Sequence, residues 1–107
     1  MIDKKKVRKA ELFLRVLTNK RIRPVLRVLE DGIIPMTVTE IMVQTFRVSG
    51  REYSQSEISG ILAELRKYGM VSFEREGKFI YYQLEYEKLE GMLNRIYSIT
   101  KAMDDVS

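Results

Sequence analysis

Residues 54–84, SQSEISGILAELRKYGMVSFEREGKFIYYQL, carry the pattern that decides the fold. In the first half of this stretch, apolar residues recur every three or four positions. This predicts an amphipathic helix with a buried stripe formed by Ile58, Ile61, Leu62 and Leu65. Tyr68–Gly69 is expected to end the helix. From Val71 onward the period becomes two and strand-forming residues dominate, which predicts a β-hairpin with a charged turn around Gly77.

A serine is expected to cap the start of this helix. Ser54 and Glu57 have capping-box spacing, in which the serine hydroxyl accepts from the backbone N–H three residues on. The glutamate carboxylate in turn accepts from the backbone N–H of the serine. Ser56 is the alternative cap. We expect one of these serines to cap the helix and the other to face outward.

Three helices are expected before this stretch and one after it. The spacing of apolar residues places them over 4–18, 21–30, 40–49 and 86–103. Asn19 and Thr39 are the N-cap candidates for the second and third helices. Residues 33–37 suit a connector or a very short strand. The predicted fold is a single mainly α domain over residues 1–107 with a β-hairpin wing, a winged helix-turn-helix. Its expected order is helix, helix, short strand, helix, helix, strand, strand, helix.

The composition excludes several kinds of chemistry. The chain has 107 residues and contains neither Cys nor His. It therefore has no thiol, no disulfide and none of the usual zinc, copper or nickel ligand sets. The commonest general base is missing as well. The sequence also has no glycine-rich phosphate loop and no nucleophile–base pair. We expect a protein that is not an enzyme, with no cofactor and no metal site.

Nothing in the sequence indicates a membrane or secreted protein. No apolar run approaches the ~20 residues that span a bilayer. The charged start of the chain is not followed by an uninterrupted apolar segment of a signal peptide. We therefore expect a cytoplasmic protein without membrane contact.

The basic charge is concentrated in the first third of the chain. The net charge is +4, and residues 1–30 hold ten Lys and Arg against three Asp and Glu. A basic segment suits an acidic partner such as nucleic acid. The alternative is a solvated helix face, which remains open for the residues at the N-terminus.

The sequence resembles the ArsR/SmtB-type winged-helix repressors over roughly residues 10–100. Ser54–Ser59, with the segment Leu62–Val71 after it, resembles the recognition helix of that family. The wing and final strand, Arg75–Leu84, resemble the same family. So does Asn19–Arg23, which leads into a Leu-rich helix.

The resemblance implies a homodimer formed by the first and last helices, residues 1–18 and 86–104. The apolar faces of both helices allow this, because a small winged helix alone has a thin core. The residues expected at the interface are Phe13, Leu17, Leu89, Met92, Leu93, Ile96 and Tyr97. The alternative is that these side chains pack only on the core of their own chain.

The family's metal sensors place Cys near the third helix, or His and carboxylates on the last helix. This chain has no Cys or His with which to do so. The sequence therefore indicates a member that does not sense metal, and its effector is unknown.

Three groups of residues are DNA-binding candidates. They are Ser54, Gln55, Ser56 and Ser59 at the start of the recognition helix, Arg75 and Lys78 on the wing, and Arg21 and Arg23 before the second helix. Glutamine can bond adenine through two hydrogen bonds, and serine can bond bases or phosphates. The alternatives are that a serine serves only as a cap and that the wing cations only keep an exposed hairpin soluble.

Two residues of the expected recognition helix and one connection depart from the family pattern. Gly60 offers no side chain for base contacts, and Glu57 is acidic beside the expected groove. Residues 46–53 make the connection before this helix longer than the usual tight turn. The predicted function is a dimeric DNA-binding transcriptional regulator, a repressor at a pseudo-palindromic site on double-stranded DNA. The alternative is a winged-helix protein-interaction module with weak or no specific DNA binding.

Overall fold

The computed structural model describes residues 3–32 and 34–106. The elements are α1 (Lys4–Thr18), α2 (Arg23–Asp31), α3 (Val38–Ser49), α4 (Gln55–Lys67), β1 (Val71–Glu76), β2 (Phe79–Leu84) and α5 (Tyr86–Val106). This order confirms the mainly α fold with a hairpin wing. The short strand expected over 33–37 is reduced to a single bridge between Met36 and Tyr82. Ile33 lies outside the described residues.

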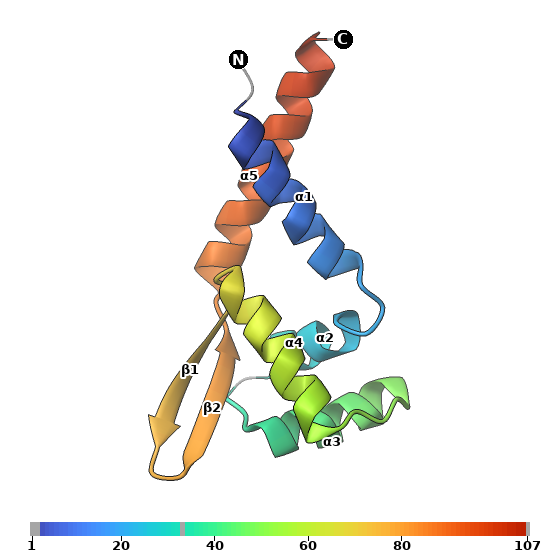
Figure 1. The fold of residues 1–107 in the computed structure, drawn as a ribbon, viewed down its shortest axis with the longest axis vertical. Coiled ribbons are helices and arrows are strands. Elements are labelled where there is room, and N and C mark those ends of the chain that lie inside the picture. The colour runs from blue at the N-terminus through green and yellow to red at the C-terminus, as the bar shows by residue number, and fades with distance from the viewer. Residues whose placement is uncertain (1–2, 33, 107) are drawn as a thin grey trace.

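The lower body of the molecule is formed by α2, α3, α4 and the hairpin (Figure 1). Its core is built from fully buried apolar residues of these elements and of the turn between α4 and β1: Val25, Ile41, Ile58, Leu62, Leu65 and Met70. Three of them belong to the stripe predicted for α4. Ile61, the fourth member of that stripe, is half-buried and packs at the edge of the same core. The body therefore holds α4 firmly along one face and leaves its other face exposed.

Helices α1 and α5 form a two-helix stalk that rises from this body and carries both termini (Figure 1). The molecule measures 50 × 29 × 22 Å, and its radius of gyration is 15.6 Å. A compact chain of this length has a radius of gyration of about 13 Å, so the molecule is elongated. The stalk therefore has outer surfaces that no other described part of the chain covers.

Phe13 was expected at a dimer interface, but the structure places it elsewhere. Its side chain has no exposed surface, because it packs into the core where α1 meets the body. Val16, one turn further on, is also buried there. Phe13 thus anchors the stalk to the body of its own chain.

Side-chain caps explain where two helices, α3 and α4, begin. Ser54 caps α4 with the predicted capping box, in which its Oγ accepts from Glu57 N at 3.0 Å and Ser54 N donates to Glu57 Oε1 at 3.1 Å. The expectation that Thr39 caps α3 is wrong. Thr37 is the N-cap, because Glu40 lies three residues after it and completes a second capping box.

Asn19 does not cap α2, which begins at Arg23 with Ile22 as an N-cap that makes no side-chain bond. The Asn19 side chain instead accepts from Arg21 N at 2.9 Å and so shapes the turn between α1 and α2.

The long connection before α4 is divided between helix and turn. Helix α3 continues to Ser49, and Gly50 ends it with φ of 71°, a left-handed conformation that favours glycine. Residues 50–54 then lead into α4. The hairpin pairs β1 and β2 in antiparallel register from Val71–Leu84 to Glu76–Phe79. The α4–β1 segment thus has the helix-and-hairpin layout that the sequence predicts.

Candidate nucleic-acid interface

The first turns of α4 form an exposed polar surface. Gln55, Ser56 and Ser59 are all exposed, as expected for residues that contact a partner. Ser54 is exposed too, but its hydroxyl oxygen accepts from Glu57 N and serves as the cap. Ser54 therefore caps the helix, and Ser56 is the serine that faces outward.

The face of α4 opposite the core carries only small side chains near its start. Successive residues on an α-helix are rotated by about 100°, so Ser56, Gly60 and Ala63 lie opposite the buried stripe. A Cβ added at Gly60 would meet no atom within 4 Å. Another molecule can therefore approach the backbone of α4 closely along this face.

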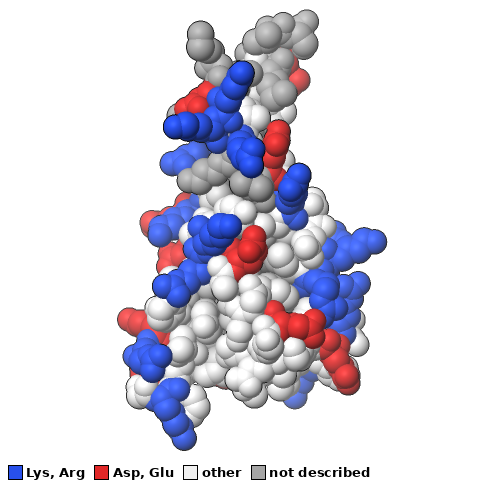
Figure 2. All heavy atoms as spheres, in the orientation of Figure 1, with Lys and Arg blue, Asp and Glu red and all other residues white. Residues whose placement is uncertain are grey.

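Four cations gather where two turns meet beside the start of α4. Arg51 Nη1 donates to the backbone oxygen of Lys20 at 2.9 Å, which joins the turn after α3 to the turn after α1. Arg21 follows Lys20 directly, and Arg23 begins α2 two residues later. We call Lys20, Arg21, Arg23 and Arg51 the basic turn cluster. Figure 2 shows Lys and Arg side chains gathered on the right of the molecule, where the α1–α2 turn lies in Figure 1.

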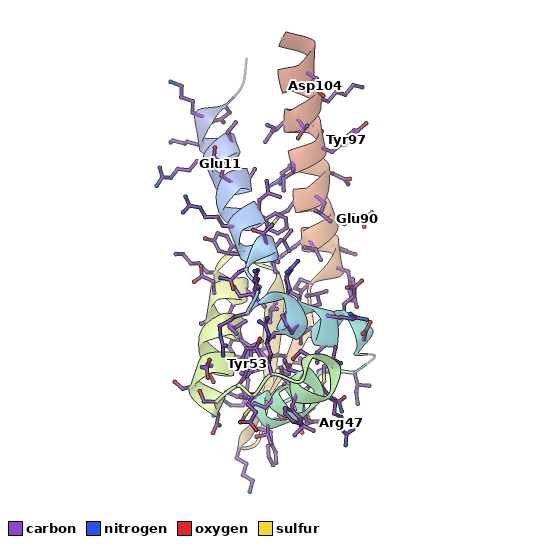
Figure 3. All side chains as sticks on the ribbon, turned by 90° about the vertical axis from the view of Figure 1, so that its right-hand side faces the viewer. Glu11, Arg47, Tyr53, Glu90, Tyr97 and Asp104 are labelled. Carbon is purple, nitrogen blue, oxygen red and sulfur yellow. The ribbon has the colours of Figure 1, made fainter. Side chains whose placement is uncertain are left out.

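Tyr53 links the turn after α3 to the turn after α1. Its side chain is only 6% exposed, and its hydroxyl donates to the backbone oxygen of Arg21 at 2.8 Å. The Arg21 guanidinium carbon lies 4.5 Å from the centroid of the Tyr53 ring, a cation–π contact. In Figure 3, Tyr53 lies within the lower body of the molecule. Tyr53 thus contacts both the backbone and the side chain of Arg21.

Arg21 also forms an ion pair with Glu57. The guanidinium Nη2 donates to Glu57 Oε2, although the two residues are 36 positions apart in the sequence. The pKa of Glu57 is lowered, first because Ser54 N donates to the carboxylate and further because of the charge of Arg21. Arg21, expected to hold a phosphate, is therefore engaged by a carboxylate of the chain itself. Arg23 is exposed at the first position of α2 and has no such partner among the described residues.

The hairpin carries the other two predicted cations. Arg75 is exposed on β1, opposite Ile80. Lys78 lies in the turn, with Nζ 5.3 Å from the centroid of the Phe79 ring. The hairpin turn and the first turns of α4 lie at the end of the molecule away from the termini (Figure 1). The structure thus brings the predicted helix and wing residues to the same end.

Sequence reasoning underestimated three residues of this site. The sequence patterns alone assign no role to Arg51, Lys20 or Tyr53. The available signal was Tyr53 itself, a single aromatic residue in the otherwise polar stretch Arg51–Ser56. An isolated apolar residue in a turn indicates a contact with a distant part of the chain, but it does not identify that part.

The residues expected at a dimer interface fall into two further groups. Leu17, Leu89, Met92 and Ile96 are partly buried against the core of the chain. Leu93 and Tyr97 are 47% and 71% exposed. They are four residues apart, so they lie on one face of α5, and Tyr97 points away from α1 (Figure 3). These two side chains form the uncovered apolar ridge of the stalk.

The described part of the chain contains no metal-binding cluster. Among these residues, no group of three or more His, Cys, Asp or Glu side chains is placed to hold a metal ion. No described helix is both long enough and apolar enough to span a bilayer.

Comparison with known proteins gives matches among solved structures only. No protein-family model and no curated protein sequence matches the chain. An ArsR-like transcriptional regulator from Rhodococcus sp. RHA1 superposes with a TM-score of 0.69 at 16% identity, over 92% of this chain and 86% of that one. The transcriptional regulator HlyU from Vibrio vulnificus CMCP6 gives a TM-score of 0.60 at 27% identity, over 89% of this chain and 91% of that one.

A third neighbour is a homodimeric winged helix-turn-helix DNA-binding domain, determined by NMR. It is the 1–100 fragment of Mb0332 from Mycobacterium bovis, a possible ArsR-family transcriptional regulator. It matches with a TM-score of 0.61 at 20% identity, over 94% of this chain and 84% of that one. All three share the fold over nearly its whole length. They confirm the winged helix-turn-helix that residues 54–84 predict.

Proposed function

We propose that this chain, which has the fold of the ArsR/SmtB-type winged helix regulators, is a DNA-binding transcriptional regulator. Its structural neighbours are transcriptional regulators of this type, and the sequence resemblance points the same way. We further propose that it acts as a homodimer in the cytoplasm and represses transcription by occupying a pseudo-palindromic operator.

One observation carries the proposal. The exposed polar start of α4 lies beside the basic turn cluster and at the same end of the molecule as the hairpin turn. An α-helix fits the ~12 Å wide major groove, and its N-terminal residues are the ones that reach base edges. Lys20, Arg23 and Arg51 of the cluster, together with Lys78, are the candidates for contacts with the phosphates on either side. Gln55, Ser56 and Ser59 are the candidates for base contacts.

The stalk supports the dimer part of the proposal. Leu93 and Tyr97 expose a ridge of apolar surface that no described residue of the chain covers. A two-fold axis near this ridge would pair α5 with its copy and point the two α4 helices in the same direction. Two such helices would enter successive major grooves about 34 Å apart.

A salt titration of DNA binding tests the function. Fluorescence anisotropy with a labelled duplex of random sequence, at several salt concentrations, should show a steep linear fall of log K with log salt, because each phosphate contact contributes about −0.9 to the slope. The variant Lys78→Ala should reduce the magnitude of the slope by about one unit. Little binding at any salt would contradict the proposal and favour the protein-interaction module instead.

Selection of bound sequences tests the role of α4. Selection from random DNA with the wild-type protein should yield a pseudo-palindrome. Gln55→Ala should weaken binding to that site more than binding to random DNA. Equal loss on both would show that Gln55 does not read a base.

Analytical ultracentrifugation tests the dimer. The substitution Tyr97→Ser in the exposed ridge should shift the protein from dimer to monomer at micromolar concentration. Phe79→Ser is a matched control, since Phe79 is a 49% exposed aromatic residue on the hairpin, outside the stalk. A wild-type protein that is monomeric, or a Tyr97→Ser variant that remains as dimeric as wild type, would contradict this interface.

A further inference from the structure

We propose that Glu57 limits the DNA affinity of this protein by holding Arg21 away from phosphate. This inference rests on the proposed DNA-binding function. It makes the ion pair at the start of α4 a determinant of affinity, in addition to its structural role. Removal of the Glu57 charge should therefore strengthen DNA binding.

The Glu57 carboxylate lies in the first turn of the proposed recognition helix and pairs with a cation of the basic turn cluster. Glu57 occupies the third position of α4, within the first turn of the proposed recognition helix. The side chains of Arg21 and Glu57 are 50% and 44% exposed, so both remain within reach of another molecule. A helix N-terminus and its free N–H groups favour an approaching anion. Here an internal carboxylate already occupies that favourable position.

Contacts that do not involve Glu57 hold Arg21 in place. Arg21 is stacked on the Tyr53 ring, and its backbone oxygen accepts from the Tyr53 hydroxyl. Loss of the Glu57 charge therefore leaves the guanidinium on the Tyr53 ring, in the turn that Arg51 joins through the backbone oxygen of Lys20. A phosphate that approaches this cluster must compete with Glu57 for Arg21, and it is also repelled by the Glu57 charge.

The two carboxylate oxygens of Glu57 do different work, which allows a clean substitution. Oε1 accepts from Ser54 N in the capping box, and Oε2 accepts from Arg21. Glutamine also serves at the third position of a capping box. Glu57→Gln therefore keeps the cap of α4 and removes the ion pair.

The expected effect follows from counterion release. One additional cation on phosphate makes the slope of log K against log salt steeper by about 0.9. At about 0.1 M salt this corresponds to roughly eightfold tighter binding of Glu57→Gln than of wild type, with the two converging near 1 M. The assay is fluorescence anisotropy with a duplex of random sequence. Thermal melting followed by circular dichroism verifies that each variant is folded.

Two controls separate release of Arg21 from a general change of charge. Glu52→Gln makes the same charge change in the turn before α4, at an exposed residue that forms no ion pair with any described residue. It should leave the slope unchanged. The double variant Arg21→Gln/Glu57→Gln should lose the added slope, because the released cation is gone.

Each outcome decides the inference. The inference is supported if the slope of log K against log salt is steeper for Glu57→Gln than for wild type and returns to the wild-type value in the double variant. This holds even if the wild type binds weakly. Wild type and Glu57→Gln with steep but equal slopes would overturn the inference and leave the proposed function intact. An equal gain from Glu52→Gln would also overturn it. Absence of DNA binding by both proteins at every salt concentration would overturn the inference and the function together.

Discussion

Gly60 is the position where the structure makes its clearest prediction about stability. It lies in the interior of α4 on the face opposite the core, and an added Cβ would meet no atom within 4 Å. Glycine in a helix interior costs about 1 kcal/mol relative to alanine, because it loses more backbone freedom on folding. Gly60→Ala should therefore raise the free energy of unfolding by about 1 kcal/mol. For a chain of 107 residues this corresponds to a rise in Tm of about 4 °C.

The assay is urea denaturation and thermal melting at one fixed protein concentration, because the Tm of a dimer depends on concentration. Gly77→Ala is the matched control, the same substitution at a glycine where it should lower stability. Gly77 lies in the hairpin turn with φ of 61°, which strains any residue with a Cβ. That variant should be destabilised. A Gly60→Ala variant no more stable than wild type would refute the reasoning and would mean that another surface covers this face of α4.

A second substitution at the same position separates stability from function. Leucine is nearly as good a helix former as alanine, so Gly60→Leu should also stabilise α4. Its side chain projects from the small-residue face, where the proposed groove would lie. Gly60→Leu should therefore weaken DNA binding at least tenfold (about 1.4 kcal/mol) while it raises Tm. Equal DNA binding by Gly60→Leu and wild type would show that this face does not approach the DNA.

Three further predictions concern polar groups. Thr45 Oγ1 is fully buried in α3 and has no hydrogen-bond partner among the described residues. Thr45→Val should therefore raise the free energy of unfolding by about 1 kcal/mol in urea titrations, and a decrease would mean that the hydroxyl has a partner. Tyr53→Phe removes the hydrogen bond from the tyrosine hydroxyl to the α1–α2 turn and should lower the free energy of unfolding by about 1 kcal/mol. An unchanged urea midpoint would contradict this prediction. The lowered pKa of Glu57 means that its stabilising effect is complete above the unfolded-state pKa and is lost as pH falls through the folded-state pKa. The difference in Tm between wild type and Glu57→Gln should therefore be present at neutral pH and vanish in acid.

Local patterns allowed the sequence to predict most of the fold. The helix over 4–18, the capping box at Ser54 and the hairpin around Gly77 are each specified by residues within a few positions of one another. The cap of α3 was predicted at the wrong threonine, since Thr37 and Thr39 are both acceptable caps. The position of Glu40, three residues after Thr37, selects the first of them.

The site was harder to predict, because it depends on contacts between distant parts of the chain. The pairing of Arg21 with Glu57 and of Arg51 with the backbone of Lys20 links segments that local patterns cannot relate. The same limit explains Phe13. Its spacing places it on the apolar face of α1, but only the packing of the stalk on the body decides whether that face meets the same chain or a partner.

The structure also divides the basic charge that the sequence places in the first third of the chain. Helix α1 has 15 residues and is therefore about 22 Å long. Lys4, Lys5 and Arg8 lie near its start on the stalk, and Lys20 and Arg21 follow its other end, beside α4. The Debye length at physiological salt is about 8 Å, so cations at the start of α1 are screened from a phosphate bound near α4. Of these cations, only those that follow α1 can contribute direct phosphate contacts there, and Glu57 pairs with one of them, Arg21. The net charge of +4 is therefore no measure of the charge at the proposed interface, and the salt slope should reflect the basic turn cluster and the hairpin turn.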